Sequence, residues 1–312
     1  MQVEDELASF SPEKETLLAI GVFDGVHLGH KYLISKLIEN ARERNLMPGV
    51  VTFRQHPQDL LSPQTKLPFL TDLVERSKLL KDEGVESVIP LSFTDALAQL
   101  SARQFVSLLQ KHLRMRGLVI GPDFALGKNR EGNTDVLHKL GQEMNFSVTV
   151  VPLVMINGEA ASSTAIREAI ATGDMRRVEK LAGHPFSLHG RIVAGAGRGM
   201  GLGFPTANLD VNGGQAIPAD GVYAGWAYIG GKVYQAMSNI GKCPTFDGAE
   251  RTVEAYILDY HDDLYGQELK IDIVERLRDE MKFDTVEELK KQVAEDVKQG
   301  RAILNSGGGN QA

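Results

Sequence analysis

Two histidines stand three residues apart directly after an apolar strand, in the stretch LLAIGVFDGVHLGHKYLI at residues 17–34. A helix that begins near residues 28–30 would place the imidazoles of His27 and His30 on one side, where we expect them to be open to solvent. The N–H groups and the dipole of a helix start favour an anion, and imidazole N–H groups can stabilise charge on the oxygens of a transferring phosphate. Gly29 would let a ligand approach the backbone closely. The stretch therefore predicts a phosphate site.

Two simpler interpretations of the histidine pair remain open. A metal site would need a third ligand, and Asp24 and His56 are the candidates, although nothing in their spacing requires a metal. The pair could also be two ordinary core histidines. The combination of glycine and histidine at the end of a strand favours phosphate binding over both.

A second glycine-rich loop, GPDFALGKNREGN at residues 121–133, also follows an apolar strand. It combines the acid Asp123 with the bases Lys128 and Arg130, which suits nucleotide binding and equally suits a solvated turn. It is not a Walker loop, because the glycine spacing differs and Asn129 follows Lys128 where that motif has Ser or Thr.

Hydroxyl side chains open a third segment, ASSTAIREAIATG at residues 161–173. Ser162, Ser163 and Thr164 stand at a predicted helix start, and Arg167 follows one turn later. Hydroxyl groups in this place are usually N-caps. Together with an arginine that can bind through two N–H groups, they could instead form a second anion site facing the histidine turn.

The densest signal is GAGRGMGLGFPTANLD at residues 195–210, in which glycines alternate up to Gly203. Such a run stabilises neither a helix nor a strand. After it, Thr206 and Asn208 stand two residues apart, so an extended chain turns them to the same side. Both are hard oxygen ligands of the kind that Mg²⁺ prefers. A loop without function is the alternative, which the rigid FPTAN segment disfavours.

Polar and apolar residues alternate in TVEAYILDY at residues 252–260, which places Glu254 on the polar face of a predicted strand. A solvated strand glutamate is the ordinary interpretation. A general base for a hydroxyl group is the catalytic one.

The elements that must position these residues differ between the two halves of the chain. In the first half, strands are predicted at residues 17–23, 49–53, 87–93, 117–124 and 148–154, with helices at 30–45, 70–84 and 101–114. This alternation predicts a doubly wound parallel α/β sheet. Ligands of such sheets bind at the carboxyl ends of the strands, where the histidine turn lies.

In the second half, strands follow one another without helices between them. Gly230 and Gly231 are typical of a hairpin turn, strands are expected at 252–260 and 269–278, and one helix at 285–304 closes the chain. This pattern predicts a small antiparallel β-barrel with a terminal helix. We therefore expect two domains, residues 1–183 and 184–312.

Composition narrows the functional classes. With 42% hydrophobic and 24% charged residues, the chain is typical of a globular protein and has no apolar run long enough to span a bilayer. Its single cysteine, Cys243, excludes an intramolecular disulfide and a cysteine-rich zinc site. The net charge of −7 argues against nucleic acid as the main partner, and the acidic start lacks a secretory pattern. We expect a cytoplasmic protein without a nucleic-acid or membrane partner, which could form a homo-oligomer.

Together these motifs resemble those of one family over nearly the whole chain, the bifunctional bacterial riboflavin kinases/FAD synthetases. The similar segments occur in the family's order: GVFDGVHLGH, VTFRQHP, GPDFALG, SSTAIREAIATG, GRGMGLGFPTANL, GVYAG, SNIGKCPT, VEAYILDYHDDLYGQEL and LRDEMKF. The resemblance implies an N-terminal nucleotidyltransferase-like domain that adenylylates FMN to FAD, and a C-terminal barrel that phosphorylates riboflavin to FMN. Riboflavin, FMN, FAD and ATP or ADP would be its ligands, and Mg²⁺ its cofactor.

The resemblance also implies roles for single residues of the first domain. His27, His30 and Arg167 would be the catalytic residues that contact phosphate. ATP would further contact a set from the three loops described above, namely Gly21, Phe23, Asp24, Gly29, Asp123, Ser163 and Thr164.

In the second domain, the resemblance makes Glu254 the base that activates the ribityl hydroxyl. Thr206 and Asn208 would hold Mg²⁺ and phosphate. The remaining candidates are Gly197 and Gly203 for ATP, and Arg278 and Phe283 for the wall of the flavin site.

Overall fold

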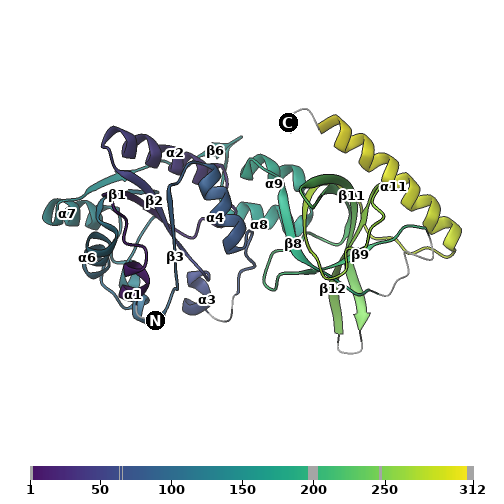
Figure 1. Ribbon diagram of the computed structural model, residues 1–312, viewed down its shortest axis with the longest axis horizontal. Helices are drawn as coiled ribbons and strands as arrows, with labels where there is room; N and C mark the ends of the chain where they lie inside the picture. The colour runs from purple at the N-terminus through teal and green to yellow at the C-terminus, as the bar shows by residue number, and fades with distance from the viewer. Residues whose placement is uncertain (1–2, 63, 65, 196–202, 246–247, 308–312) are drawn as a thin grey trace. The chain divides into compact units, whose positions relative to one another are not determined.

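The computed structural model of the chain describes residues 3–62, 64, 66–195, 203–245 and 248–307. By its internal contacts the chain divides into two compact units, Met1–Ser163 and Thr164–Ala312 (Figure 1). The boundary between residues 183 and 184 that the sequence suggests lies two helices further along the chain.

The first unit is built on a five-stranded sheet in the order β3-β2-β1-β4-β5. Every neighbouring pair of its strands runs parallel. The strands are β1 (Thr16–Ile20), β2 (Met47–Phe53), β3 (Ser87–Leu91), β4 (Met115–Ile120) and β5 (Ser147–Val150). The predicted doubly wound parallel sheet is confirmed.

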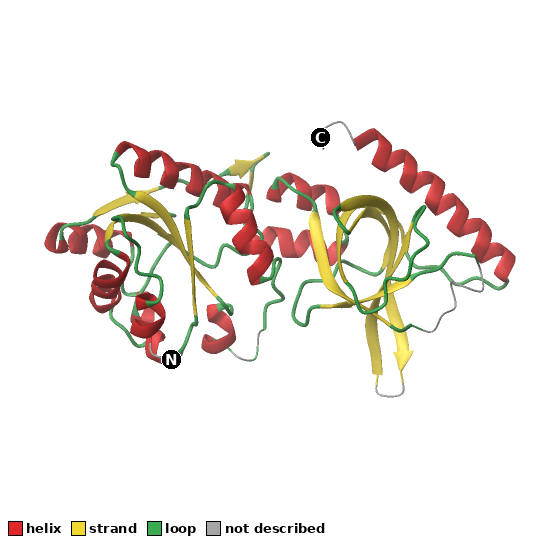
Figure 2. Ribbon diagram, in the orientation of Figure 1, coloured by secondary structure: helices red, strands yellow, loops and turns green. Residues whose placement is uncertain are grey.

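Helices cover both faces of this sheet (Figure 2). A parallel sheet must bury both of its faces, and alternate residues of β1 point to opposite faces. Leu18 and Ile20 pack in one core with α1, α6 and α7, whereas Leu17 and Ala19 pack in another with α2 and α4. The helices of this unit are α1 (Val3–Ala8), α2 (Leu28–Glu43), α3 (Pro57–Leu61), α4 (Leu73–Asp82), α5 (Asp95–Ala98), α6 (Ala102–Leu113) and α7 (Thr134–Met144), with the 3₁₀ turn η1 (Lys128–Arg130) and the small hairpin β6 (Met155–Ile156) and β7 (Glu159–Ala160).

The strand order decides where a ligand can bind in this unit. The chain steps from β1 through β2 to β3, and then returns to the other side of β1 with β4. The loops that follow β1 and β4 therefore leave the sheet side by side, at the point where the strand order reverses. Such a point forms the binding crevice of doubly wound sheets. It brings the histidine turn and the loop at residues 121–127 to one place, although a hundred residues separate them.

The second unit contains a closed barrel in the order β10-β11-β12-β9-β8-β13, with antiparallel neighbours throughout. Its strands are β8 (Phe186–Val193), β9 (Ala207–Val211), β10 (Gly221–Ile229), β11 (Lys232–Thr245), β12 (Gly248–Ile257) and β13 (Glu268–Arg278). Gly230 and Gly231 form the expected hairpin turn with φ of 56° and 78°. The predicted antiparallel barrel is confirmed.

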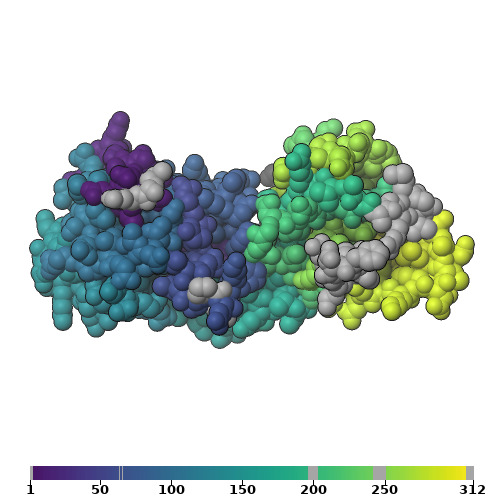
Figure 3. Space-filling view, turned by 90° about the horizontal axis from the view of Figure 1, so that it is seen from below, coloured from purple at the N-terminus to yellow at the C-terminus, as the bar shows by residue number. Residues whose placement is uncertain are grey.

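Among the described residues of the second unit, three helices are present: α8 (Ser163–Thr172), which begins at the boundary of the units, α9 (Met175–Ala182) and the terminal α11 (Val286–Gly307). The end of α11 forms part of the surface of this unit in Figure 3. On its inner side, Val297 and Leu304 pack against Met237 and Ala224 of the barrel. At Gly300 the helix lies so close to Met237 that a side chain there would overlap it. Among the residues that the structure describes, no helix is both long and apolar enough to cross a membrane.

Candidate active sites

The turn after β1 has a strained backbone. Phe23, Gly25 and Val26 have φ of 52°, 81° and 35° within four residues. Positive φ in a buried, β-branched residue such as Val26 is rare and unfavourable. Strain of this kind persists where the surroundings fix the backbone, and it clusters at ligand sites. The geometry therefore supports a functional interpretation of this turn.

The two histidines of the turn are in direct contact. Helix α2 begins at Leu28, and His27 is its N-cap, with Nδ1 accepting a hydrogen bond of 3.3 Å from the backbone N–H of His30. The rings of His27 and His30 stack, with centroids 3.6 Å apart and planes 22° apart. An accepting Nδ1 carries no proton, so the neutral His27 ring has its proton on Nε2. The expectation that both rings lie on one side of the helix start is confirmed.

The expectation that both imidazoles are open to solvent is wrong for His27, which is 6% exposed. The reason is local: the ring lies under its own helix start and is covered by His30. His30 itself is only partly buried, and its enclosed Nδ1 has no hydrogen-bond partner in the part of the chain that the structure describes. Burial lowers the pKa of His30 well below 6.5, and the neighbouring His27 and Arg76 lower this pKa further because they disfavour a second positive charge beside them. His30 is therefore a neutral ring at neutral pH.

Asp24 organises the loop around the turn. Its carboxylate is 1% exposed and accepts hydrogen bonds from the backbone N–H groups of Leu70, at 2.9 and 3.0 Å, and Thr71, at 3.0 Å. The guanidinium of Arg76, itself 4% exposed, lies 3.8 Å from Oδ1 of Asp24. These contacts explain the burial of Asp24 without a metal. Its role in ATP binding stays a prediction.

The metal alternative finds no support within the described ranges. They contain no group of three His, Cys, Asp or Glu side chains that could hold a metal ion. His56, one of the suggested third ligands, is the N-cap of α3, and its Nδ1 accepts the N–H of Gln58 at 3.1 Å.

Packing inside the protein accounts for two glycines of the turn. A Cβ at Gly29 would lie 2.8 Å from the carbonyl oxygen of Ala161 and 3.1 Å from the His27 ring. A Cβ at Gly21 would lie 3.2 Å from the ring of Phe23, which is buried and packs 5.0 Å from His30. The contribution of Gly21, Phe23 and Gly29 to ATP binding is not tested by these contacts and stays a prediction.

The loop after β4 exposes one acid at the same edge of the sheet. Asp123 is exposed, and its carbonyl oxygen accepts a hydrogen bond of 2.9 Å from Nη2 of Arg130. Leu126 turns into the core. Arg130 thus stabilises the loop, and the carboxylate of Asp123 lies at the point where the strand order reverses.

Ser163 connects the third predicted segment to the histidine turn. Its hydroxyl donates a hydrogen bond of 2.8 Å to the backbone carbonyl of Asp24. Helix α8 starts at Ser163, so Thr164 lies in its first turn and Arg167 one turn further. Ser163, the last residue of the first unit, is therefore hydrogen-bonded to the histidine turn. The places of Thr164 and Arg167 in the phosphate site remain predictions.

In the second unit, most of the predicted kinase residues line a single cavity of about 410 Å³. It brings together residues from two loops, four barrel strands and the terminal helix, among which are the predicted Thr206, Glu254, Arg278 and Phe283. The cavity wall combines apolar side chains, such as Val222 and Met237, with a few charged groups. That mixture suits a flat, largely apolar ligand with polar edges.

A second cavity, of about 520 Å³, adjoins the first at Thr206. Thr206 lines both cavities, and Asn208 lines the second one together with Gly195, Tyr260 and Tyr265. Thr206 and Asn208 thus line the same cavity, and their shared role in holding Mg²⁺ stays a prediction. Two adjoining cavities suit a reaction in which a group passes from one ligand to another.

Glu254 lines the first cavity, beside the threonine that both cavities share. The hydroxyl of Thr206 is 3.4 Å from Oε2 of Glu254. Across the sheet, Glu254 pairs with Asn208 on β9 and with Asn239 on β11. A hydroxyl, two amides and a carboxylate are all hard donors that fit Mg²⁺, so the residues present suit that ion. Gly203 precedes this group, in a turn with φ of 85°. Gly197 lies outside the described residues.

Sequence reasoning missed four residues of these sites. Arg76 lies on a helix whose periodicity gave no functional signal, and Asn239, Glu280 and Asp296 line the first kinase cavity. Asn239 could have been found from the strand register, because it stands opposite Glu254. Asp296 had no such signal, since an acid on an amphipathic helix is ordinarily solvated.

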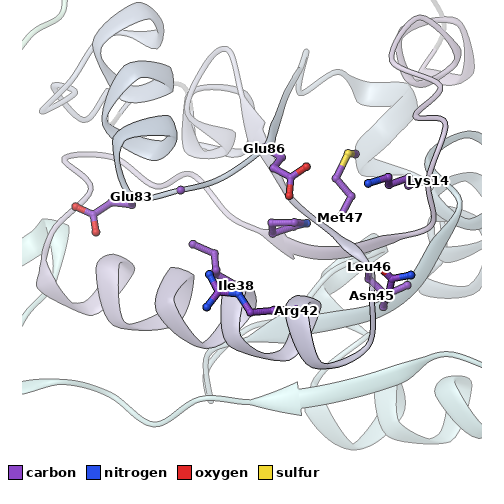
Figure 4. A pocket seen from close by; sticks show the side chains of 10 residues that line it. Lys14, Ile38, Arg42, Asn45, Leu46, Met47, Glu83 and Glu86 are labelled. Carbon is purple, nitrogen blue, oxygen red and sulfur yellow. The ribbon is translucent and has the colours of Figure 1, made fainter.

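A further pocket, of about 480 Å³, lies at the opposite edge of the first sheet (Figure 4). It is lined by the ends of α2 and α4 and the starts of β2 and β3, including Arg42, Met47 and Glu86. Because ligands of doubly wound sheets bind at the carboxyl ends of strands, we do not assign this pocket to catalysis.

Two family models match the chain. The model described as FAD synthetase matches residues 10–165, and the model described as Riboflavin kinase matches residues 182–304. Their limits agree with the parallel sheet and the barrel, and residues 166–181 lie between them.

Relatives of nearly the same length share one description, bifunctional riboflavin kinase/FMN adenylyltransferase. The relative from Escherichia coli (strain K12) is 39% identical over 290 residues, which cover 92% of each chain. That from Pseudomonas fluorescens is 35% identical over 306 residues, 97% of this chain and 98% of its own. That from Bacillus subtilis (strain 168) is 32% identical over 292 residues, 92% of each chain.

A solved structure shares the fold over the same length. A crystal structure described as a macrolide-efflux protein from Streptococcus pneumoniae has a TM-score of 0.89 and 32% sequence identity, and the likeness covers 96% of this chain and 97% of that chain. Its description differs from those of the two family models and the three relatives, which agree with one another.

Proposed function

Since the chain belongs to the family of bifunctional riboflavin kinase/FMN adenylyltransferases, we propose that its two units divide the family's two reactions through the residues described above. The chain phosphorylates riboflavin with ATP to give FMN, and joins the AMP part of a second ATP to FMN to give FAD and pyrophosphate. The proposal assigns FMN formation to the barrel and FAD formation to the parallel sheet, with residues 1–183 and 184–312 as the two domains.

In the adenylyltransferase site, the protein binds and orients two phosphates. An oxygen of the FMN phosphate attacks the α-phosphorus of ATP, and the bond to the bridging oxygen breaks as pyrophosphate leaves with its electron pair. The attacking phosphate is already an anion, so no base is needed. Charge stabilisation and positioning carry such a transfer.

Of the two histidines, His30 is better placed to donate a hydrogen bond to phosphate in this step. It is neutral and partly exposed, so one ring N–H can donate to phosphate without releasing a proton. A bound anion would raise its pKa again and strengthen the contact. His27 holds the helix start, and Arg167, Thr164, Ser163 and the exposed Asp123 complete the site of the proposal.

In the kinase site, Glu254 accepts the proton of the ribityl hydroxyl as its oxygen attacks the γ-phosphorus of ATP, and ADP leaves with the bridging oxygen. The single observation that carries this assignment is the position of Thr206, which lines both cavities and lies 3.4 Å from Glu254. Riboflavin would lie in the first cavity, against Arg278 and Phe283, and ATP in the second.

Mg²⁺ belongs to the proposal as the cofactor of the kinase site. Thr206 and Asn208 would hold it, and it would neutralise charge on the ATP phosphates. A cytoplasmic location is also proposed, because both reactions consume ATP. Gly203 would approach the phosphates, as would Gly197 according to the resemblance.

Product analysis tests the whole assignment. The protein is incubated with riboflavin, ATP and Mg²⁺, and separately with FMN, ATP and Mg²⁺, and the flavins are separated by chromatography. We expect FMN and FAD in the first reaction and FAD in the second. FMN without FAD would restrict the proposal to the barrel, and no FMN from riboflavin would overturn its kinase half.

A further inference from the structure

Two charged side chains from distant segments are held together inside the first kinase cavity. Arg278 ends β13, and Asp296 lies on α11 with 4% of its surface exposed. The guanidinium donates to the carboxylate through Nε, 2.9 Å from Oδ1, and through Nη2, 2.8 Å from Oδ2. Gln292 donates to the same carboxylate at 2.9 Å. A buried charge is tolerated when it is paired and hydrogen-bonded in this way.

The pairing leaves part of the guanidinium for a ligand. A guanidinium has five N–H groups. Two donate to Asp296, and one, on Nη1, donates to the carbonyl of Asp279 at 2.9 Å. The remaining two have no acceptor among the described residues. Arg278 and Asp296 both line the cavity that contains Glu254, and Arg278 lies 5.9 Å from the ring centre of Phe283.

Attachment of the terminal helix does not explain this buried pair. Val297, Leu304 and the close approach at Gly300 already fix α11 to the barrel. A second ion pair, between Arg301 of α11 and Asp259, also joins the helix to the barrel at 2.8 Å. Buried ion pairs contribute little net stability compared with apolar residues of the same size. The pair in the cavity therefore calls for a reason connected with the ligand.

We propose that Asp296 is a positioning residue for riboflavin. It fixes the plane of the Arg278 guanidinium, so that the two remaining N–H groups meet carbonyl oxygens on the polar edge of the isoalloxazine ring. Holding the arginine in one rotamer before binding removes an entropy cost from the binding step. The inference rests on the proposed riboflavin site, and it adds to that site a residue from the terminal helix.

The test is the steady-state kinetics of Asp296→Asn in the full chain, with riboflavin and ATP varied separately. We expect the KM for riboflavin to rise about tenfold, as for a lost charge-assisted hydrogen bond, while kcat changes less than about threefold. The KM for ATP and the formation of FAD from supplied FMN should not change. An unchanged KM for riboflavin in a folded variant would overturn the proposal.

Asp259→Asn is the matched control. It breaks the other ion pair of α11, which is more exposed and lies outside the cavity. We expect its KM for riboflavin to equal that of the parent chain. If Asp259→Asn raised this KM as much as Asp296→Asn, helix attachment would explain both results and the positioning role would be lost.

The exchanged pair, Arg278→Asp with Asp296→Arg, separates positioning from structure. A merely structural pair would recover both the melting temperature and the KM for riboflavin on exchange. A positioning role predicts that the KM stays raised even when the melting temperature recovers. If Asp296→Asn does not fold, Arg278→Lys keeps the charge but loses the planar fork, and the same rise in KM is expected of it.

The result can be told apart from failure of the riboflavin site itself. If Glu254→Gln abolishes FMN formation while Asp296→Asn leaves the KM unchanged, only this inference fails. If Glu254→Gln retains full kinase activity, the site assignment fails first.

Discussion

The histidine turn of the first unit and the cavity of the barrel are built in different ways. The turn uses backbone: the strained residues Phe23, Gly25 and Val26, a helix start at Leu28 and a pair of stacked histidines, of which His30 is neutral, all within about ten residues of sequence. The barrel uses side chains, and Thr206, Glu254, Arg278 and Asp296 come to one cavity from segments spread over ninety residues. A reaction whose nucleophile is already anionic needs donors and a rigid frame, whereas a hydroxyl nucleophile needs a base opposite its phosphate. Under the proposed assignment, the difference between the two sites matches the difference between the two nucleophiles.

The substitution with the largest expected effect on this contrast is Glu254→Gln. Removing the base should lower FMN formation by about 10² to 10⁴-fold and leave FAD formation from supplied FMN unchanged. Both rates are measured on the same preparation by flavin chromatography. Gln in place of Glu268, an exposed residue at the start of β13, is the control and should change neither rate. Equal loss of both activities in Glu254→Gln would contradict the division between the units.

His30→Ala makes the reciprocal test. Loss of one preorganised donor should lower FAD formation by about 10²-fold and spare FMN formation. The exposed His138 on α7, changed to alanine, serves as the matched control. An unchanged rate of FAD formation in His30→Ala would remove the phosphate role of this histidine.

Gly25→Ala sharpens the claim that the turn depends on backbone shape. At φ of 81° a Cβ is strained, and it would lie 2.8 Å from Cδ1 of Leu70. We expect the free energy of unfolding to fall by about 2 kcal/mol, measured by urea denaturation. Gly158→Ala has a similar φ, of 85°, with no atom within 4 Å, and should cost about 1 kcal/mol from strain alone. Equal losses in the two variants would show that the contact with Leu70 is unimportant.

The smallest expected effect is a pH dependence of stability. The folded state holds the pKa of His30 below 6.5, so the unfolded chain binds the proton more readily. Stability contributed by the neutral ring is therefore complete above pH 6.5 and falls as the pH drops below it, by at most about 1.4 kcal/mol per pH unit. His30→Gln should flatten this part of a plot of melting temperature against pH. A parent chain with the same slope as His30→Gln would contradict the burial of the ring.

The fold of both units was predictable because local sequence patterns, such as apolar periodicity and helix caps, determine where the strands and helices lie. Strands β1 to β5 and the terminal helix follow apolar periodicity, and Ser101 and Gln104 form the capping box of α6 that their spacing predicts. Two candidate residues with strong motifs, Thr206 and Glu254, lie 3.4 Å apart, and their roles in the reaction stay predictions.

Other features depend on contacts that no local pattern records. The burial of His27 results from stacking by His30, and the partners of Asp24 lie near residue 70, on another loop. Asp296 looks like a solvated helix residue until the barrel brings Arg278 beside it. Long-range packing, rather than propensity, decides which polar side chains of this protein are buried.

The polarity of the first sheet also has a practical consequence. Every strand points its carboxyl end at the reaction, so the rim where strands begin, around Asn45 and Glu86, is remote from it. A reporter domain inserted beside Asn45 through flexible linkers would occupy that rim. The chain should then still form FMN and FAD. The same insertion in the loop at residues 121–127 would instead block the crevice and abolish FAD formation.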